Sequence, residues 1–343
     1  MNSKIKSYFE NLNPKKLDLK NKVKVSQVKK IGMGTSNLNY LVIANKRKFV
    51  FRLNMDPKLR AKSKREFKAL RMLEKYKIGP KAFSIDKSRK IFDSDLIIIS
   101  YLEGKTVNKT SDYFKNKMII NIAKLCANLH LIKIQGKLKK LHKDNSIKGC
   151  NRYVKFLKKE YLIYINKNLR NKTLKKIIKD TYDDIIRNVP KSKYNSDLVL
   201  SQGDLCEQNV IVNKGKYKLI DFEDLELTDR ASHLAHLLTD FGRTFEEDQK
   251  ELFLNEYLKK IKVDRVELEE KINTWTPIKL FEIFLWSIKH TLRIKNNEMH
   301  SEFSKNDDMD NNLTYVETMF KKNIRFNVID KKYKNFDIEK VLK

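Results

Sequence analysis

Three oxygen-bearing side chains lie close together in the sequence. Asp204 and Asn209 stand in a polar loop that follows an apolar run, and Asp221 follows two short apolar segments. The connection between these segments, Asn213–Lys216, is rich in the residue types of a β-hairpin turn. A hairpin turning about Gly215 places Asn209 and Asp221 opposite each other at its open end. Asp204 then lies on the loop just before them.

This trio contains two carboxylates and one amide. Carboxylate and amide oxygens are hard ligands of the kind that Mg²⁺ prefers, and a separate aspartate can orient an attacking hydroxyl group. The arrangement therefore suits phosphoryl transfer. Either half alone fits a polar loop beside an ordinary hairpin equally well, whereas the two halves at this spacing are much more specific.

Two motifs carry a family resemblance. Gly203-Asp204-x4-Asn209, followed by Ile220-Asp221-Phe222-Glu223, resembles the paired signature of the aminoglycoside phosphotransferase and choline kinase superfamily. Its members are small-molecule kinases with a protein-kinase-like fold. The resemblance implies that Asp204 orients the acceptor hydroxyl and takes its proton, and that Asn209 and Asp221 bind Mg²⁺. It also implies transfer of the γ-phosphoryl group of ATP, or of GTP, to a hydroxyl of a small molecule.

The N-terminal third of the chain fits the same pattern. Three strands are expected, at Gln27–Ile31, Asn37–Ala44 and Lys48–Leu53. Gly32 and Gly34 lie between the first two strands, where glycines let backbone N–H groups approach phosphate oxygens. Gly-x-Gly alone is more often a simple turn. Followed by Ser36 and Asn37, it resembles the nucleotide loop of the superfamily.

A basic residue and an acidic residue are the next candidates. Arg52 stands near the end of the third strand, where the resemblance implies a side chain for the α- and β-phosphates. The segment Lys62–Tyr76 has apolar residues at helical spacing, and Glu66 flanks that apolar face. Glu66 is therefore the best partner for Arg52. The plainer interpretation of both is a solvated surface charge.

The fold expected from these segments is a two-lobed, protein-kinase-like α+β fold. Ser100–Gly104 resembles the hinge between lobes, which implies that backbone groups of Ser100 and Leu102 bind adenine. The expected parts are a peripheral segment at 1–24, an N-lobe of antiparallel sheet plus helix at 25–103, a mainly helical C-lobe at 104–322 and a basic tail at 323–343.

Composition excludes some classes of protein. Of 343 residues, 41% are hydrophobic, which is enough apolar content for a globular chain. The net charge is +31. A nucleic acid is one partner that such charge can serve. Lysine is spread almost evenly, however, and the basic residues lack the aromatic interleaving of a base-stacking surface. We therefore do not expect nucleic-acid binding.

The compartment follows from apolar runs and cysteines. No apolar run approaches the ~20 residues that span a bilayer, and the first residues lack the apolar core of a signal peptide. Three cysteines without metal-type spacing indicate free thiols in a reducing compartment. We expect a cytoplasmic protein with no membrane partner, either a monomer or a homodimer.

Three histidines need a separate interpretation. His130 resembles a position that is commonly His in the superfamily, and we expect it to be structural. His233 and His236 are three apart on an expected helix, a spacing that suits a metal. The sequence shows no further ligand for them, so we interpret both as helix-surface or polar core residues.

Two positions depart from the superfamily pattern. Gln202 precedes Gly203, where His is usual, and its amide can brace the loop by hydrogen bonds but cannot carry charge. Ser232 and His233 follow Arg230, where an Asp is usual. Neither departure removes a candidate metal ligand or the candidate catalytic carboxylate.

Acidic residues are dense around the second candidate metal ligand. Five fall within nine residues: Asp221, Glu223, Asp224, Glu226 and Asp229. Glu223 and Asp224 are candidate substrate contacts, and solvated surface charges are the plainer interpretation. Carboxylates stabilise an ammonium group and repel an anion. We therefore expect a cationic acceptor, such as an aminoglycoside-like or choline-like compound or an amino alcohol.

Two other function classes stay open. A nucleotide-binding protein without catalysis would account for the altered bracing residues. Such proteins usually lack at least one of Asp204, Asn209 and Asp221, all of which are present here. A nucleic-acid-binding protein would differ from both kinds of kinase-like protein by salt-dependent binding to arbitrary RNA or DNA.

Overall fold

The structure is a computed structural model that describes residues 1–33, 37–54, 60–190, 196–242, 244–298 and 309–342. The chain divides into two compact units. Unit 1 holds Met1–Leu129, Lys133–Leu141 and Ser201–Glu226, and unit 2 holds His130–Ile132, His142–Leu200 and Leu227–Lys343. Within the described ranges, every helix is too short or too polar to cross a membrane.

Unit 1 is built on an antiparallel sheet of five strands in the order β1-β2-β3-β5-β4. The strands are β1 (Val25–Met33), β2 (Asn37–Ala44), β3 (Arg47–Asn54), β4 (Ala82–Asp86) and β5 (Asp95–Ser100). The first three match the strands expected from the sequence, each with bounds equal to or slightly wider than expected. The short turn between β2 and β3 contains Asn45 and Lys46 at positive φ, which turns the chain back on itself.

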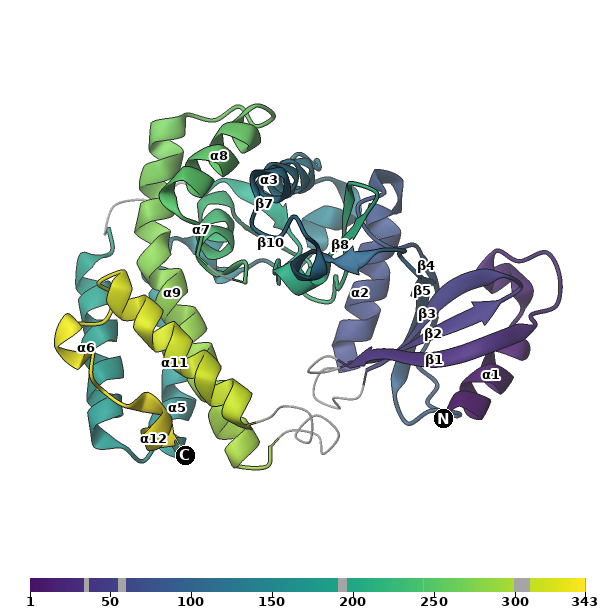
Figure 1. The fold of residues 1–343 in the computed structure, drawn as a ribbon, viewed down its shortest axis with the longest axis horizontal. Helices are drawn as coiled ribbons and strands as arrows, with labels where there is room; N and C mark the ends of the chain where they lie inside the picture. Colours follow the sequence, from purple (N-terminus) through teal and green to yellow (C-terminus); the bar gives the residue numbers. More distant parts are fainter. Residues whose placement is uncertain (34–36, 55–59, 191–195, 243, 299–308, 343) are drawn as a thin grey trace. The chain divides into compact units, whose positions relative to one another are not determined.

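The two faces of this sheet carry different side chains, because successive residues of a strand point to opposite sides. On β3, Phe49 and Phe51 are fully buried in one apolar cluster. Arg52 points to the other face and meets Glu66 of helix α2 (Arg60–Leu73). Figure 1 shows α1 (Asn2–Glu10) and α2 on the two sides of the sheet.

The N-terminal segment is part of this core, so the expected peripheral segment at 1–24 is wrong. Helix α1 buries Ile5, Tyr8 and Phe9 in the same cluster as the phenylalanines of β3. The Tyr8 hydroxyl also donates to Asp86 Oδ2 at 3.1 Å, which ties α1 to β4. Because the other residues of α1 are mostly polar, the three apolar positions gave too weak a sequence signal.

A second, smaller sheet belongs to the same unit. It has the order β6-β8-β9, from β6 (Lys105–Thr106), β8 (Val210–Asn213) and β9 (Lys216–Leu219). Lys214 and Gly215 have φ of 48° and 74°, as a tight two-residue hairpin turn requires. Helix α3 (Asn116–His130) supplies a buried apolar face that includes Met118, Ile122 and Leu129.

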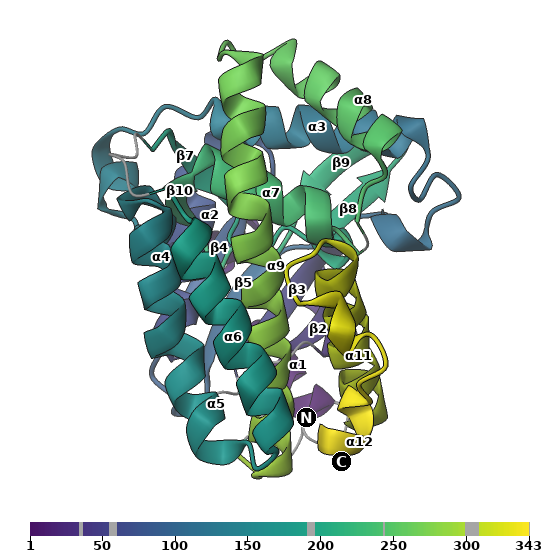
Figure 2. The same ribbon diagram turned by 90° about the vertical axis from the view of Figure 1, so that its left-hand side faces the viewer.

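Unit 2 is mainly helical. The 31-residue helix α9 (Arg265–Lys295) contacts α4, α5, α7 and α11, and Figure 2 shows these helices beside it. The remaining bounds are α4 (Cys150–Leu157), α5 (Ile163–Asn168), α6 (Lys172–Asn188), α7 (Arg230–Asp240), α8 (Glu247–Leu258), α11 (Met309–Arg325) and α12 (Ile338–Leu342). Strands β7 (Leu198–Ser201) and β10 (Glu226–Asp229) form a two-stranded sheet.

A buried polar network joins helices of unit 2. His130 contacts the Tyr257 hydroxyl through Nδ1 at 2.6 Å and His233 Nδ1 through Nε2 at 2.7 Å. Arg230 also donates to the Tyr257 hydroxyl. Burial, reinforced by neighbouring positive charge, lowers the pKa of His130 well below its ordinary value and that of His233 to about 3. Both rings are therefore neutral core groups, in line with the structural role expected for them.

The C-terminal segment is also packed, so the expected basic tail at 323–343 is wrong as a description of the structure. Ile329, Ile338 and Leu342 are buried. The Phe336 ring lies 5.9 Å from the ring of Phe320 on α11. These few apolar residues, spaced among many lysines, anchor the segment to unit 2.

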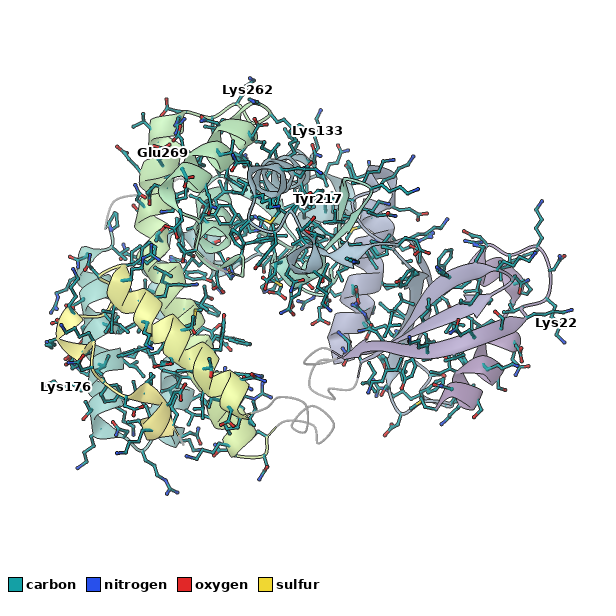
Figure 3. The ribbon with its side chains drawn as sticks, in the orientation of Figure 1. Lys22, Lys133, Lys176, Tyr217, Lys262 and Glu269 are labelled. Carbon is teal, nitrogen blue, oxygen red and sulfur yellow. The ribbon has the colours of Figure 1, made fainter. Side chains whose placement is uncertain are left out.

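The positive charge is distributed over both units. Figure 3 labels exposed lysines in unit 1, Lys22 and Lys133, and in unit 2, Lys176 and Lys262. Many lysines and arginines form exposed ion pairs with neighbouring acids, such as Lys179 with Asp183 at 2.8 Å. Such pairs contribute little to stability. The labelled lysines show that exposed positive charge occurs in both units.

The packing of α1 generates a stability prediction. Replacing Phe9 by Ala leaves a cavity between α1 and β3, and we expect the free energy of unfolding to fall by about 3–5 kcal/mol. Lys6→Ala, on the exposed side of the same helix, is the matched control and should change it by less than about 0.5 kcal/mol. Urea unfolding followed by circular dichroism measures both. Equal values for the two variants would show that α1 does not contribute to the core.

Candidate active site

The candidate catalytic residues lie in unit 1, on the loop and hairpin between Ser201 and Glu226. The hairpin forms as expected, but its register differs by one residue from the prediction. Val210 pairs with Leu219, and the Ile220 N–H donates to the Asn209 carbonyl at 2.9 Å. Asn209 therefore lies opposite Ile220, and Asp221 is the next residue along. The position of the turn determines which residues pair, and the pairing predicted from the sequence was off by one residue.

Asp204 and Asn209 are in direct contact. The Asn209 amide nitrogen donates to the Asp204 carbonyl at 2.8 Å and to its carboxylate Oδ2 at 2.9 Å. Since that amide nitrogen faces Asp204, the amide oxygen is the atom left to act as a ligand on the other side. One short 3-10 turn, Glu207–Asn209, holds the two residues at this spacing.

The environment of Asp204 disfavours its charged form. Asp204 is exposed as a residue, but protein atoms around its carboxylate displace water. This loss of hydration, together with the nearby carboxylates of Asp221 and Asp224, raises the pKa of Asp204 to about 6, although the bond from Asn209 opposes this rise. A carboxylate that lies among other carboxylates is stabilised when it binds a cation or a proton. A proton-accepting role at neutral pH is compatible with this value, because a base works best with a pKa near the operating pH.

Arg52 connects the sheet to the hairpin end. Its Nη1 lies 2.6 Å from Glu66 Oε1 and 3.1 Å from Asp221 Oδ1, and its Nε donates to Asn39 on β2 at 2.9 Å. Arg52 and Glu66 are 6% and 1% exposed, so this is a buried ion pair. Burial raises the pKa of Glu66, and Arg52 opposes that rise. The expected pairing is present, and a role of the pair toward phosphates stays a prediction.

A contact that the sequence did not indicate joins the glycine-loop region to the acidic segment. The Asn37 amide nitrogen donates to Glu223 Oε2 at 3.0 Å. Asn37 is buried, and its amide oxygen has no hydrogen-bond partner among the described residues. The two residues are 186 positions apart, and both were candidates for separate roles. Only the fold reveals that they are in contact.

The other candidates are placed as follows. Gly32 lies within β1, whereas Gly34 and Ser36 lie outside the described residues. The Ser100 N–H donates to Lys81, and the Ser100 hydroxyl accepts from the Lys81 N–H. The Ser100 N–H is therefore occupied within the sheet, and adenine binding by backbone groups of Ser100 and Leu102 stays a prediction. Asp224 lies 3.8 Å from Arg65.

These residues fit the divalent cation that the family resemblance implies. Asn209 and Asp221 offer the amide and carboxylate oxygens that suit Mg²⁺ as hard ligands, and Asp204 stands beside them as the candidate proton acceptor. The buried, unpartnered oxygen of Asn37 shows further unused acceptor capacity beside Glu223.

Comparison with known proteins agrees with this geometry. The model of the phosphotransferase enzyme family matches residues 27–270. The chain belongs to this family. It is therefore a phosphotransferase, and the matched residues include the candidate catalytic residues Asp204, Asn209 and Asp221. No curated protein sequence matches the chain significantly.

Solved structures of phosphotransferases are similar to most of the chain. A choline kinase from Cryptosporidium parvum Iowa II is 17% identical, with a TM-score of 0.60 and coverage of 93% of each chain. The GDP and kanamycin complex of APH(2″)-IIIa is 14% identical, with a TM-score of 0.63, over 94% of this chain and 98% of that one. A Plasmodium vivax ethanolamine kinase is 19% identical, with a TM-score of 0.59, over 91% and 84%. This phosphotransferase thus has the two-lobed, protein-kinase-like α+β fold expected from its sequence.

The buried pair generates a prediction about stability. Arg52→Met leaves Glu66 buried and uncompensated, and we expect a loss of about 3–5 kcal/mol in the free energy of unfolding. In the double variant with Glu66→Leu the loss should be smaller than the sum of the single losses, because both charges are gone. Urea unfolding of the two single variants and the double variant gives the coupling free energy.

The matched control for this cycle is Lys48→Met. Lys48 lies 2.7 Å from Glu103 in the same unit, but both side chains are about half exposed, so the change should be below about 1 kcal/mol. A coupling free energy below about 1 kcal/mol for Arg52 and Glu66 would contradict a buried ion pair.

Proposed function

We propose that this phosphotransferase transfers the γ-phosphoryl group of ATP, or of GTP, to a hydroxyl group of a small molecule that carries an amine or another cationic group. The observation that carries the proposal is the meeting of Asp204, Asn209 and Asp221 with Arg52 in one unit. A set of two carboxylates, an amide and a buried cation matches the needs of phosphoryl transfer, which depends on positioning and charge.

Each residue has a stated role in the proposal. Asp204 accepts a hydrogen bond from the acceptor hydroxyl and takes its proton as the new O–P bond forms and the bond to the leaving diphosphate breaks. Asn209 and Asp221 would hold Mg²⁺, which would supply positive charge to offset the negative charge of the phosphates. Arg52, oriented by Glu66, binds phosphate oxygens by its guanidinium group.

Similar proteins support nucleotide use and an amine-bearing acceptor. The solved structures include complexes with GDP and kanamycin, and an ATP complex with streptomycin. Others are a choline kinase and an ethanolamine kinase. Choline and ethanolamine both combine a hydroxyl group with a positively charged nitrogen. We extend this acceptor class to the present chain because its candidate site is acidic.

The acidic segment has two kinds of members. Asp229 is 1% exposed and caps α7, where it accepts from the N–H groups of Ala231 and Ser232. It is therefore a structural residue. Glu223 and Asp224 are only partly buried, so they stay the candidates for contact with an ammonium group.

The role of Asp204 generates a prediction about catalysis. Asp204→Asn keeps the size of the side chain but removes the proton acceptor, and we expect kcat to fall by about 10²–10⁴ with nucleotide affinity little changed. Asp221→Asn should also weaken Mg²⁺-nucleotide binding, because it removes a charged ligand. Asp93→Asn, an exposed aspartate of unit 1, is the control. Unchanged turnover in Asp204→Asn would show that this carboxylate is not the base.

The charge of the acceptor generates a second prediction. We expect kcat/KM to be highest for cationic alcohols, lower for matched neutral alcohols and lowest for matched anionic ones, since the local carboxylates stabilise an ammonium group. A panel of aminoglycosides, choline, amino alcohols, sugars and sugar acids, assayed for nucleotide consumption at constant ionic strength, measures this order. If the anionic members were the best substrates, the proposed acceptor class would be wrong.

A further inference from the structure

Gln202 is fully buried at the base of the candidate catalytic loop. Its amide nitrogen donates to the backbone carbonyl of Ile220 at 3.0 Å and to that of Asp221. Its amide oxygen accepts from the backbone N–H of Asp204 at 2.9 Å. One side chain therefore connects the backbone of the candidate proton acceptor to the backbone of a candidate metal ligand.

The backbone that Gln202 holds at Asp221 is strained. Asp221 has φ of 61°, in the left-handed region that a non-glycine residue rarely adopts. Such conformations persist only where surrounding contacts enforce them, and they concentrate at functional sites. The amide nitrogen of Gln202 donates to the carbonyl of this strained residue and to the one before it. The conformation that aims the Asp221 side chain is thus fixed by Gln202.

Neighbouring contacts hold the rest of the same segment. Gly203 has φ of 92°, and a Cβ atom there would lie 2.2 Å from the Asp224 carbonyl oxygen. Phe222 is fully buried, and its ring packs against Gly79. A Cβ atom added at Gly79 would lie 2.5 Å from that ring, too close for any residue but glycine. These contacts hold the residues that follow Asp221 by packing. Gln202 donates to the Asp221 carbonyl and also accepts from the Asp204 N–H, so its hydrogen bonds reach both residues.

We infer that Gln202 is a positioning residue that sets the separation and orientation of Asp204 and Asp221 for phosphoryl transfer. The inference rests on the proposed function, because it gives Gln202 a role through those two residues. It also explains why this chain can do without the histidine that is usual at this position. In this inference Gln202 replaces that histidine by keeping hydrogen bonds to both backbones.

The chemistry of the amide supports this replacement. A primary amide offers two N–H donors on one atom and an acceptor oxygen on the other, so Gln202 serves two carbonyls and one N–H together. A neutral imidazole has one donor and one acceptor. It can therefore reproduce one bond to a carbonyl and the bond from the Asp204 N–H. Methionine has nearly the same length and shape as glutamine but makes none of these bonds.

This comparison defines the experiment. Gln202→Met should lower kcat and raise the half-saturating Mg²⁺ concentration. The ratio of kcat to that concentration should fall by roughly 10- to 100-fold, as is usual when a residue that orients a metal ligand is lost. The KM for the acceptor should change little. Gln202→His should recover most of both losses. Gln208→Ala, an exposed glutamine of the same loop, is the matched control and should resemble wild type.

Two results would overturn the inference. One is a folded Gln202→Met variant with wild-type kcat and Mg²⁺ dependence. The other is equal impairment of the Met and His variants with equally lowered melting temperatures, which would indicate a purely structural role. If Gln202→Met does not fold, Gln202→Asn replaces it, since its shorter amide cannot reach both backbones at once, and the same two results then decide.

Failure of the proposed function gives a different result. If wild-type protein phosphorylates no acceptor in the panel, the proposed function is wrong in its reaction. The role of Gln202 is then read from titration calorimetry with Mg²⁺ and ADP, in which Gln202→Met should bind the metal-nucleotide pair more weakly than wild type and Gln208→Ala should not. Equal affinity in all three proteins would contradict the role of Gln202 as well.

Discussion

The buried guanidinium group of Arg52 is the interaction on which the candidate site depends. It contacts Glu66 of α2, Asn39 of β2 and Asp221 beyond the hairpin. An arginine can serve three partners in different directions because its donors lie in a rigid plane, which a lysine lacks. Removing a charge of this kind from water is costly, and only close, well-directed partners offset the cost. The positions of the helix, the sheet and the hairpin end are therefore mutually constrained within unit 1.

The sheet separates apolar packing from polar packing, so that burial on one face offsets the cost of burying charge on the other. Alternation along β3 sends Phe49 and Phe51 to one face, where α1 covers them, and sends Arg52 to the other. The apolar face supplies the hydrophobic stabilisation, so the opposite face is free to hold charged groups. Unit 1 also includes Ser201–Glu226. The residues proposed to bind nucleotide and metal, so far as the structure describes them, thus belong to one compact body.

The sequence predicted the strands, the hairpin and the Arg52–Glu66 pair because each depends on local pattern or on a motif with fixed spacing. It missed features that depend on distant packing. Helix α1 has three apolar residues whose partners lie on β3 and β4, and Asn37 meets Glu223 across 186 positions. The hairpin register was one residue off, since a turn can close at either of two neighbouring positions with the same composition. Short-range patterns carry no information on which of these contacts form.

The net charge of +31 favours an anionic ligand, whereas the acidic candidate site favours a cationic one. The distance of each charge from the site decides which effect is larger. Charges in water are screened over about 8 Å at physiological ionic strength, so lysines spread over the outer surface act weakly on Asp204. Its pKa is raised by the loss of water around the carboxylate and by the carboxylates of Asp221, Asp224 and Glu223. At this position, local negative charge outweighs the sum over the molecule. Total charge therefore bears on how the protein behaves toward bulk polyanions, whereas the proposed choice of a cationic acceptor rests on the few carboxylates near Asp204.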